Sequence, residues 1–119
     1  MISDPAYATA STSVINSGTI PWMSPELLYP EQYGLKDSQP TKESDYYALG
    51  MVIFEVLSGR PPFAGYKGFI VTRKVIEGER PERPEGPWLT DDLWATLKQC
   101  WSSQPADRPT AEAVIDLFV

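Results

Sequence analysis

The stretch ALGMVIFEVL, residues 48–57, limits most strongly what this chain can fold into, because Glu55 is its only charged residue. A continuous nonpolar strand usually ends after about four to eight residues, so the length of this stretch predicts a helix. Its nonpolar side chains fall on every side of a helical wheel, which predicts a helix buried nearly all round by other helices. Gly59 and the prolines after it predict the C-terminal end. A bilayer crossing would need about 20 nonpolar residues, so we expect a core helix.

Four further segments are expected to form helices around this one. A short helix should follow Pro25, with Ser24 as its N-cap. An amphipathic helix should run from Phe69 to Gly78, and Thr90 and Thr110 should cap two more. The expected buried positions of those last two helices are Leu93, Trp94, Leu97, Cys100 and Trp101, then Ala113, Val114, Leu117 and Phe118.

The predicted fold class is therefore all-α, with five helices of unequal length in one domain. No segment alternates between polar and nonpolar residues as a half-buried strand does, and no internal repeat is present. Residues 1–18 are small and polar, a loop composition, and residues 29–41 read as a surface connection. A chain of 119 residues is long enough for one core.

Charge and residue usage exclude several classes of protein. With 10 basic and 16 acidic residues, a net charge of −6 and no basic run, neither nucleic acid nor a membrane surface is an expected partner. Cys100 is the single cysteine, which rules out an intrachain disulfide and favours a reducing compartment, the cytoplasm first and the nucleus second. No secretory signal is visible at the N-terminus. Histidine is absent, which removes His-based triads and His-containing metal sites.

Three motifs in order resemble those of protein kinases. GTIPWMSPE, residues 18–26, resembles the P+1 loop, which faces the substrate, running into the Ala-Pro-Glu motif with Ser24 in place of Ala. SDYYALG, residues 44–50, resembles the start of the kinase central helix. CW at 100–101 and QPADRPT at 104–110 resemble the signature that closes the C-terminal lobe. With GRPPF at 59–63, the resemblance covers about residues 1–118 and implies the helical C-lobe of a kinase domain around a buried central helix.

The particular form of these motifs resembles the tyrosine-kinase-like group of Ser/Thr kinases. WM at 22–23 and the Cys-Trp pair are typical of this group and of tyrosine kinases. Thr19 stands where Ser/Thr kinases keep a threonine, and the segments 29–41 and 77–84 are similar to fungal kinases. The resemblance implies transfer of the γ-phosphoryl group of ATP, with Mg²⁺, to a Ser or Thr hydroxyl of a protein substrate, with Tyr left open.

The motifs that perform phosphate chemistry in kinases are missing from this sequence. It contains no G-x-G-x-x-G loop and, without histidine, no His-Arg-Asp. Asp4 is the one candidate for the metal aspartate of Asp-Phe-Gly, but Pro5 follows it, and a solvated loop residue is the favoured interpretation. We therefore expect a kinase fragment, without N-lobe or catalytic loop, that binds no ATP or metal and is catalytically inactive alone.

The resemblance assigns roles to several residues that remain. Glu26 and Arg108 would form the family's buried ion pair, a structural role, with two unrelated surface charges as the alternative. Asp45 would support the catalytic loop in an intact kinase, or here serve only as an acid in the first turn of the central helix. The substrate-facing P+1 loop would consist of Gly18, Thr19, Ile20 and Pro21.

Other polar side chains receive weaker interpretations. A phosphate in the activation loop can order a segment by pairing with arginine, although a serine-rich loop without that role is the favoured interpretation here. Cys100, on a nonpolar helix face, is expected to be a buried, inert thiol. Trp22 and Trp88 are expected to pack in the interior. The possible phosphorylation sites are Ser11, Thr12, Ser13 and Ser17.

Two rival hypotheses remain beside the kinase fragment. One is a non-catalytic, kinase-like module that binds a protein partner through residues 66–78 and 90–101, which an exposed nonpolar patch near Phe69 and Ile70 would favour. The other is a relic that folds poorly, because without the catalytic-loop region the nonpolar faces of the central helix would lack their usual cover. The expected partner is a protein substrate for the kinase fragment and a docking partner for the binding module.

Overall fold

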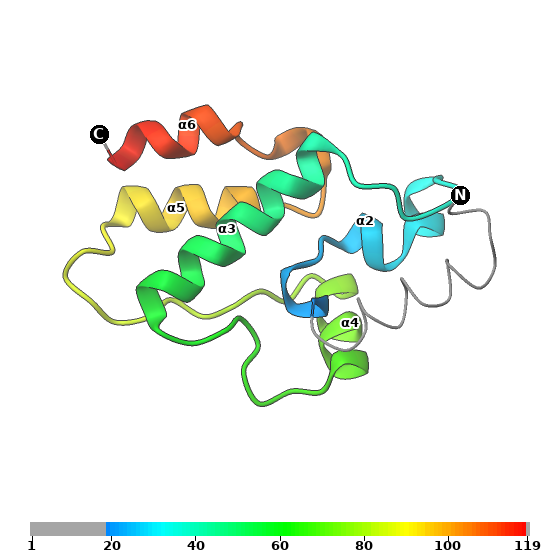
Figure 1. Ribbon diagram of the computed structural model, residues 1–119, viewed down its shortest axis with the longest axis horizontal. Helices are drawn as coiled ribbons and strands as arrows, with labels where there is room; N and C mark the ends of the chain where they lie inside the picture. Colours follow the sequence, from blue (N-terminus) through cyan, green and yellow to red (C-terminus); the bar gives the residue numbers. More distant parts are fainter. Residues whose placement is uncertain (1–18, 119) are drawn as a thin grey trace.

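The computed structural model describes residues 19–118, and no strand occurs among them, so the all-α prediction is confirmed (Figure 1). Within residues 19–118, five α-helices follow one another where the sequence predicted them, with four short 3₁₀ turns before, between and after them. The α-helices are α2 (Pro25–Leu28), α3 (Lys42–Ser58), α4 (Gly68–Ile76), α5 (Asp91–Cys100) and α6 (Ala111–Ile115). The 3₁₀ turns are η1 (Ile20–Trp22), η2 (Pro30–Tyr33), η3 (Pro105–Asp107) and η4 (Asp116–Phe118).

The central helix α3 begins and ends at clear local signals. Thr41 and Ser44 form a reciprocal capping box: the Ser44 amide donates to the Thr41 hydroxyl at 3.0 Å, and the Thr41 amide donates to Ser44 Oγ at 2.8 Å. At the other end Gly59 takes a left-handed conformation, φ 75°, and its amide donates to the Glu55 carbonyl. The predicted stop at Gly59 is confirmed.

The helix α3 lies between two groups of helices, with α5 and α6 on one side and α2 and α4 on the other (Figure 1). Its buried positions, Tyr47, Gly50, Met51 and Phe54, recur at helical spacing and face the core. The ring of Trp101, at the end of α5, meets the Phe54 ring edge to face at a centroid distance of 5.9 Å. The core therefore forms mainly where α3 crosses α5.

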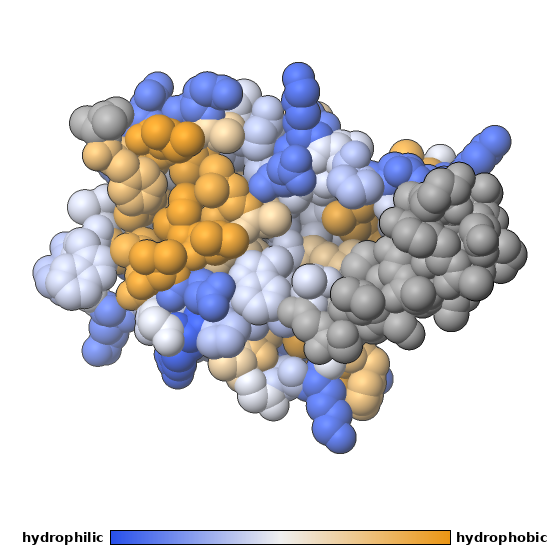
Figure 2. All heavy atoms as spheres, viewed as in Figure 1, coloured by the Kyte–Doolittle hydropathy of each residue, from blue (hydrophilic) through white to orange (hydrophobic). Residues whose placement is uncertain are grey.

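The prediction that α3 is buried nearly all round is wrong for residues 19–118. Val52 is 46% exposed and Val56 is 75% exposed, so one nonpolar face of the helix has no cover in this part of the chain. Figure 2 shows nonpolar atoms gathered over the region of α3 and α6. Periodicity could not reveal this face, because both valines look like core residues in the sequence.

Three expectations about packing need correction. Of the four nonpolar positions predicted for the last helix, Val114 alone is buried, and Leu117 and Phe118 fall in the 3₁₀ turn η4, where α6 has already ended. Ala113, Leu117 and Phe118 are exposed instead. Trp88 is 64% exposed and does not pack in the interior. Ser24 stands at the N-cap of α2 as predicted, but its side chain makes no capping hydrogen bond.

Replacing Thr41 with alanine is expected to lower the free energy of unfolding by about 1 kcal/mol, because the amide of Ser44 loses its acceptor. Thr41→Ser keeps a hydroxyl oxygen at the same position and should lose only a fraction of that amount. Urea unfolding followed by circular dichroism measures both. Equal losses for the two variants would contradict a role for the capping oxygen.

Candidate functional site

The predicted substrate-facing loop is held in a fixed shape where the structure describes it. In η1, the Trp22 amide donates to the Thr19 carbonyl at 3.0 Å, and the Ile20 side chain is buried in the core. Trp22 Nε1 donates to Glu55 Oε1 on α3 at 3.1 Å, so this tryptophan fastens the turn to the central helix. Thr19 stays exposed at the surface. Gly18, the first residue of the predicted loop, lies outside the described residues.

A hollow of about 280 Å³ opens beside this turn. One wall is η1, and the other is the loop that connects α3 to α4. Phe63 in that loop has a φ of 57°, which is rare for an aromatic residue and stores backbone strain where the wall turns. The hollow is lined by Ile20, Pro21 and Trp22 and, across from them, by Pro61, Pro62, Phe63, Ala64, Gly65, Tyr66 and Gly68. It is therefore a mainly nonpolar hollow.

Glu26 and Arg108, 82 positions apart in the chain, meet in a buried bidentate ion pair. Both distances between guanidinium nitrogen and carboxylate oxygen are 2.7 Å, and the two residues are 3% and 6% exposed. Arg108 also donates to the carbonyls of Glu43 at 2.8 Å and Ser102 at 3.0 Å. The planar guanidinium of Arg108 thus bonds to groups in three places at once. It connects α2, the start of α3 and the turn after α5. We call Glu26 and Arg108 the anchor pair.

The anchor pair shifts the acidity of its carboxyl group. Burial alone would raise the pKa of Glu26, but the hydrogen bonds and the charge of Arg108 outweigh burial and hold the pKa below the ordinary value of 4.5. The carboxylate is therefore ionised at neutral pH. The pair lies near the predicted loop in sequence, since Glu26 belongs to α2, the helix that follows η1.

Lowering the pH is expected to destabilise the wild-type chain more steeply than the Glu26→Gln variant. Because the folded-state pKa is lowered, the contribution of Glu26 is complete above the unfolded value near 4.5 and is lost as the pH falls through the folded value. Urea unfolding at a series of acidic pH values gives the slope for each protein. Glu112→Gln, at an exposed position on α6, is the control and should keep the wild-type slope. Identical slopes for wild type and Glu26→Gln would contradict the lowered pKa.

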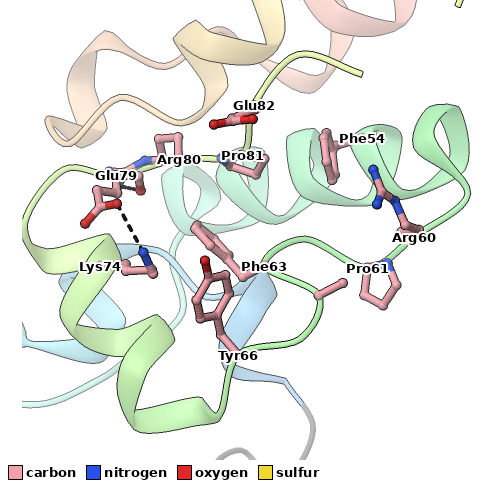
Figure 3. Close-up of a pocket in the computed structure, with 11 residues that line it drawn as sticks. Phe54, Arg60, Pro61, Phe63, Tyr66, Lys74, Glu79, Arg80, Pro81 and Glu82 are labelled. Atoms are coloured by element: carbon pink, nitrogen blue, oxygen red, sulfur yellow. Dashed lines mark hydrogen bonds and ion pairs between the residues drawn. The ribbon is translucent and has the colours of Figure 1, made fainter. Parts of the chain in front are cut away.

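A second hollow, of about 320 Å³, was not predicted from the sequence (Figure 3). The α3–α4 loop and the segment that follows α4 form its two sides, and Phe54 on α3 also lines it. Lys74 Nζ lies 3.3 Å from Glu79 Oε1 and 4.6 Å from the centre of the Tyr66 ring. Lys74, which lines this hollow, is thus already paired with a carboxylate and an aromatic face. The proline-rich loops at 59–66 and 79–84 were the only sequence signal, and loops do not reveal their shape by periodicity.

Several predicted residues are not part of this site. Asp45 lies exposed in the first turn of α3, where no other side chain of residues 19–118 pairs with it. Its position matches the interpretation as an acid near the helix N-terminus. Asp4 and the possible phosphorylation sites, Ser11, Thr12, Ser13 and Ser17, lie outside the described residues.

The thiol of Cys100 is expected to resist modification in the folded chain. The residue is fully buried, and burial raises the pKa of the thiol to about 11, so very little thiolate forms near neutral pH. A disulfide reagent at pH 8 should therefore label the native protein slowly and the urea-unfolded protein rapidly. Rapid labelling of the native protein would show that the thiol is accessible.

Two features are missing from the described part of the chain. No helix within residues 19–118 is long and nonpolar enough to cross a membrane. Nor do three or more Asp, Glu, Cys or His side chains gather there in a way that could hold a metal ion.

Comparison with known proteins adds independent information. Residues 2–118 match the family described as "Protein tyrosine and serine/threonine kinase". The chain is 35% identical over 102 residues, 86% of its length, to "Probable serine/threonine-protein kinase gdt4" of Dictyostelium discoideum. It is 34% identical over 96 residues, 80% of its length, to "Proto-oncogene tyrosine-protein kinase ROS" of Homo sapiens. These alignments span 6% and 4% of the two relatives, and a fungal origin stays a prediction.

Proposed function

This chain belongs to the protein tyrosine and serine/threonine kinase family, and we propose that it supplies the substrate-facing surface of the helical lobe of a kinase domain. In this proposal the intact kinase transfers the γ-phosphoryl group of ATP to a Ser or Thr hydroxyl of a protein, with Tyr as the less favoured acceptor. Thr19, at the position where Ser/Thr kinases keep a threonine, supports that preference. The relatives include proteins named for both kinds of kinase, so the family leaves the choice of acceptor open.

The observation that carries the proposal is the anchored turn beside the nonpolar hollow. The anchor pair holds α2, and α2 follows the turn η1 directly. Trp22 fastens the same turn to α3. A short peptide that lies along Thr19 to Pro21 would place one side chain in the hollow between η1 and Phe63. Because that hollow is mainly nonpolar, we propose that the residue after the phosphate acceptor is nonpolar.

We propose that this chain does not by itself supply the groups that ATP and Mg²⁺ need. Kinases in general hold Mg²⁺ with carboxylate and amide side chains and cover the phosphates with a glycine-rich loop. The sequence has no such loop, and residues 19–118 contain no group of acidic side chains that could hold a metal ion. We therefore assign no step of phosphate chemistry to these residues and propose that the 119-residue chain is inactive by itself.

Peptide binding tests the proposed surface. The isotopically labelled chain is titrated with two peptides that are identical except for the residue after a central serine, which is leucine in one and aspartate in the other. We expect the leucine peptide to shift amide resonances of Thr19, Ile20, Trp22 and residues 63–66, and the aspartate peptide to shift them much less, because a charge is costly to bury in a nonpolar hollow.

The variant Ile115→Ala provides a control, because Ile115 is exposed on α6, outside the hollow. It should bind the leucine peptide as the wild type does, whereas Phe63→Ala should weaken binding. Shifts that map to other surfaces, or equal binding of both peptides, would contradict the proposal.

A non-catalytic binding module is the second candidate function. Phe69, at the start of α4, is 69% exposed and offers a nonpolar contact at the surface named by that hypothesis, although Ile70 beside it is partly buried. A protein partner that docks there should lose affinity on Phe69→Ala and keep it on Phe63→Ala. The reverse pattern would favour the substrate-facing surface, so these two variants separate the candidates.

The remaining expectations concern the compartment and modification. The free, buried thiol of Cys100 supports a reducing compartment, and we propose the cytoplasm or nucleus. Ser11, Thr12, Ser13 and Ser17 stay proposed phosphorylation sites. Mass spectrometry of the protein isolated from its own cells would detect phosphate on them, and its consistent absence would count against that role.

A further inference from the structure

Arg80, in the segment that follows α4, is a cation with an unusually complete set of partners. Its Nε donates to the Trp101 carbonyl at 2.8 Å, and Nη2 donates to Ser103 Oγ at 3.1 Å. Its Nη1 donates to the carbonyls of Val75 at 3.0 Å and Glu79 at 2.7 Å. One guanidinium thus joins the C-terminal end of α4 to the turn that ends α5.

The same turn is held by the anchor pair. Arg108 Nε donates to the Ser102 carbonyl at 3.0 Å, between the two residues that Arg80 contacts. Two arginines from distant parts of the chain therefore hold three successive residues, 101–103. A shift of this turn would change the direction from which Arg108 reaches Glu26, because the guanidinium is planar and rigid.

A buried aromatic ring lies next to both guanidinium groups. The Tyr47 ring on α3 is fully buried, with the Arg80 Cζ 5.4 Å and the Arg108 Cζ 5.2 Å from its centroid. Its hydroxyl has no hydrogen-bond partner among the described residues, so the ring and not the hydroxyl makes the useful contact. The order of contact is therefore Arg80, Tyr47, Arg108 and Glu26.

We propose that Arg80 is a positioning residue, which keeps the Arg108 guanidinium aligned with the Glu26 carboxylate through residues 101–103 and the Tyr47 ring. Since α4 also packs against η1 and α2, the helix that precedes Arg80, whose last turn Arg80 holds through the Val75 carbonyl, touches the substrate-facing turn directly as well. Through the anchor pair and α4, Arg80 thereby helps to hold the substrate-facing turn η1 in place. Only this last step rests on the proposed function.

The pKa of Glu26, measured from its carboxyl carbon resonance in the labelled 119-residue chain, reports the alignment of the anchor pair. Arg108 is the charged group that acts on this carboxyl, and the Glu26 charge in turn acts on Tyr33 and Tyr47. Arg80→Ala should shift the pKa of Glu26 upward, toward its ordinary value. Arg80→Lys keeps the charge but cannot span the same carbonyl and hydroxyl groups, so an upward shift there isolates geometry from charge. Arg73→Ala, an exposed cation on α4, is the control and should leave that pKa unchanged.

An unchanged Glu26 pKa in folded Arg80→Lys and Arg80→Ala would overturn the proposal, because Arg80 would then clamp its own turn only. Failure of Arg80→Lys to fold, with Arg73→Ala folded, would also overturn it, since the residue would be needed for the fold itself. Peptide affinity is measured on the same samples. A pKa response without peptide binding would keep the positioning role and reject the proposed function, and peptide binding without a pKa response would do the reverse.

Discussion

Replacing Arg108 with alanine is expected to lower the free energy of unfolding by about 3–5 kcal/mol, the largest single effect in this molecule. The change removes both bonds to Glu26 and leaves a carboxylate that is 3% exposed without its cation. It also frees the carbonyls of Glu43 and Ser102, which Arg108 joins. Because domains of this size have a total stability of about 5–15 kcal/mol, this loss would be a large share of the total. Urea unfolding measures the loss.

A surface ion pair provides the matched control. Arg83 and Asp91 approach to 2.7 Å, as the anchor pair does, but their side chains are 40% and 93% exposed. Arg83→Ala should therefore cost less than about 1 kcal/mol. Arg108→Lys should lie between the two, since an ammonium cannot bridge both carboxylate oxygens in the same plane. A loss for Arg108→Ala no larger than that for Arg83→Ala would contradict the view that burial makes the anchor pair important.

The second large effect is expected for Gly50→Ala, which should destabilise the chain by about 1–3 kcal/mol. Helix propensity alone predicts the opposite, since alanine in a helix interior is favoured over glycine by about 1 kcal/mol. In α3, however, a Cβ at position 50 would lie 2.7 Å from Cys100 Cβ and 2.8 Å from Trp101 Nε1. Neither atom belongs to the far end of a flexible side chain, so α3 and α5 would have to move apart. The sign of the change decides between packing and propensity.

The variant Val56→Ala serves as the control on the same helix. Val56 is 75% exposed, so its replacement should change the stability by no more than about 0.5 kcal/mol. Thermal or urea unfolding of both variants completes the test. A Gly50→Ala protein more stable than the wild type would show that α3 and α5 do not approach as closely as the structure has them.

Sequence reasoning worked best where the cause of a structure is local. Thr90 and Thr110 were predicted as caps, and each side chain accepts a hydrogen bond from the amide three residues later. The buried face of α5 followed from helical spacing and is confirmed at Leu93 and Leu97. The left-handed Gly59 ended α3 where glycine suits the geometry.

Long-range contacts were beyond such reasoning. The pairing of Glu26 with Arg108 was expected only because the motifs around them resemble a known family, since no local pattern links positions so far apart. The stacking of Arg80 and Arg108 on Tyr47 had no sequence signal at all. The hollows depend on loop conformations, including the left-handed backbone of Phe63, which composition does not predict. An uncovered face of α3 was expected only under the hypothesis of a poorly folding relic, because nonpolar residues look alike in a sequence whether covered or open.

Phosphate transfer by the chain itself tests the central claim most directly. The claim is that these residues supply an anchored, substrate-facing surface and not the groups that act on ATP. The purified 119-residue chain is incubated with Mg²⁺ and ATP labelled in the γ-phosphate, together with protein substrates that offer Ser, Thr and Tyr. We predict no transfer above the level of a heat-denatured sample, while the leucine peptide still binds at residues 19–22. Transfer that copurifies with the chain and is reduced by Phe63→Ala would contradict the claim.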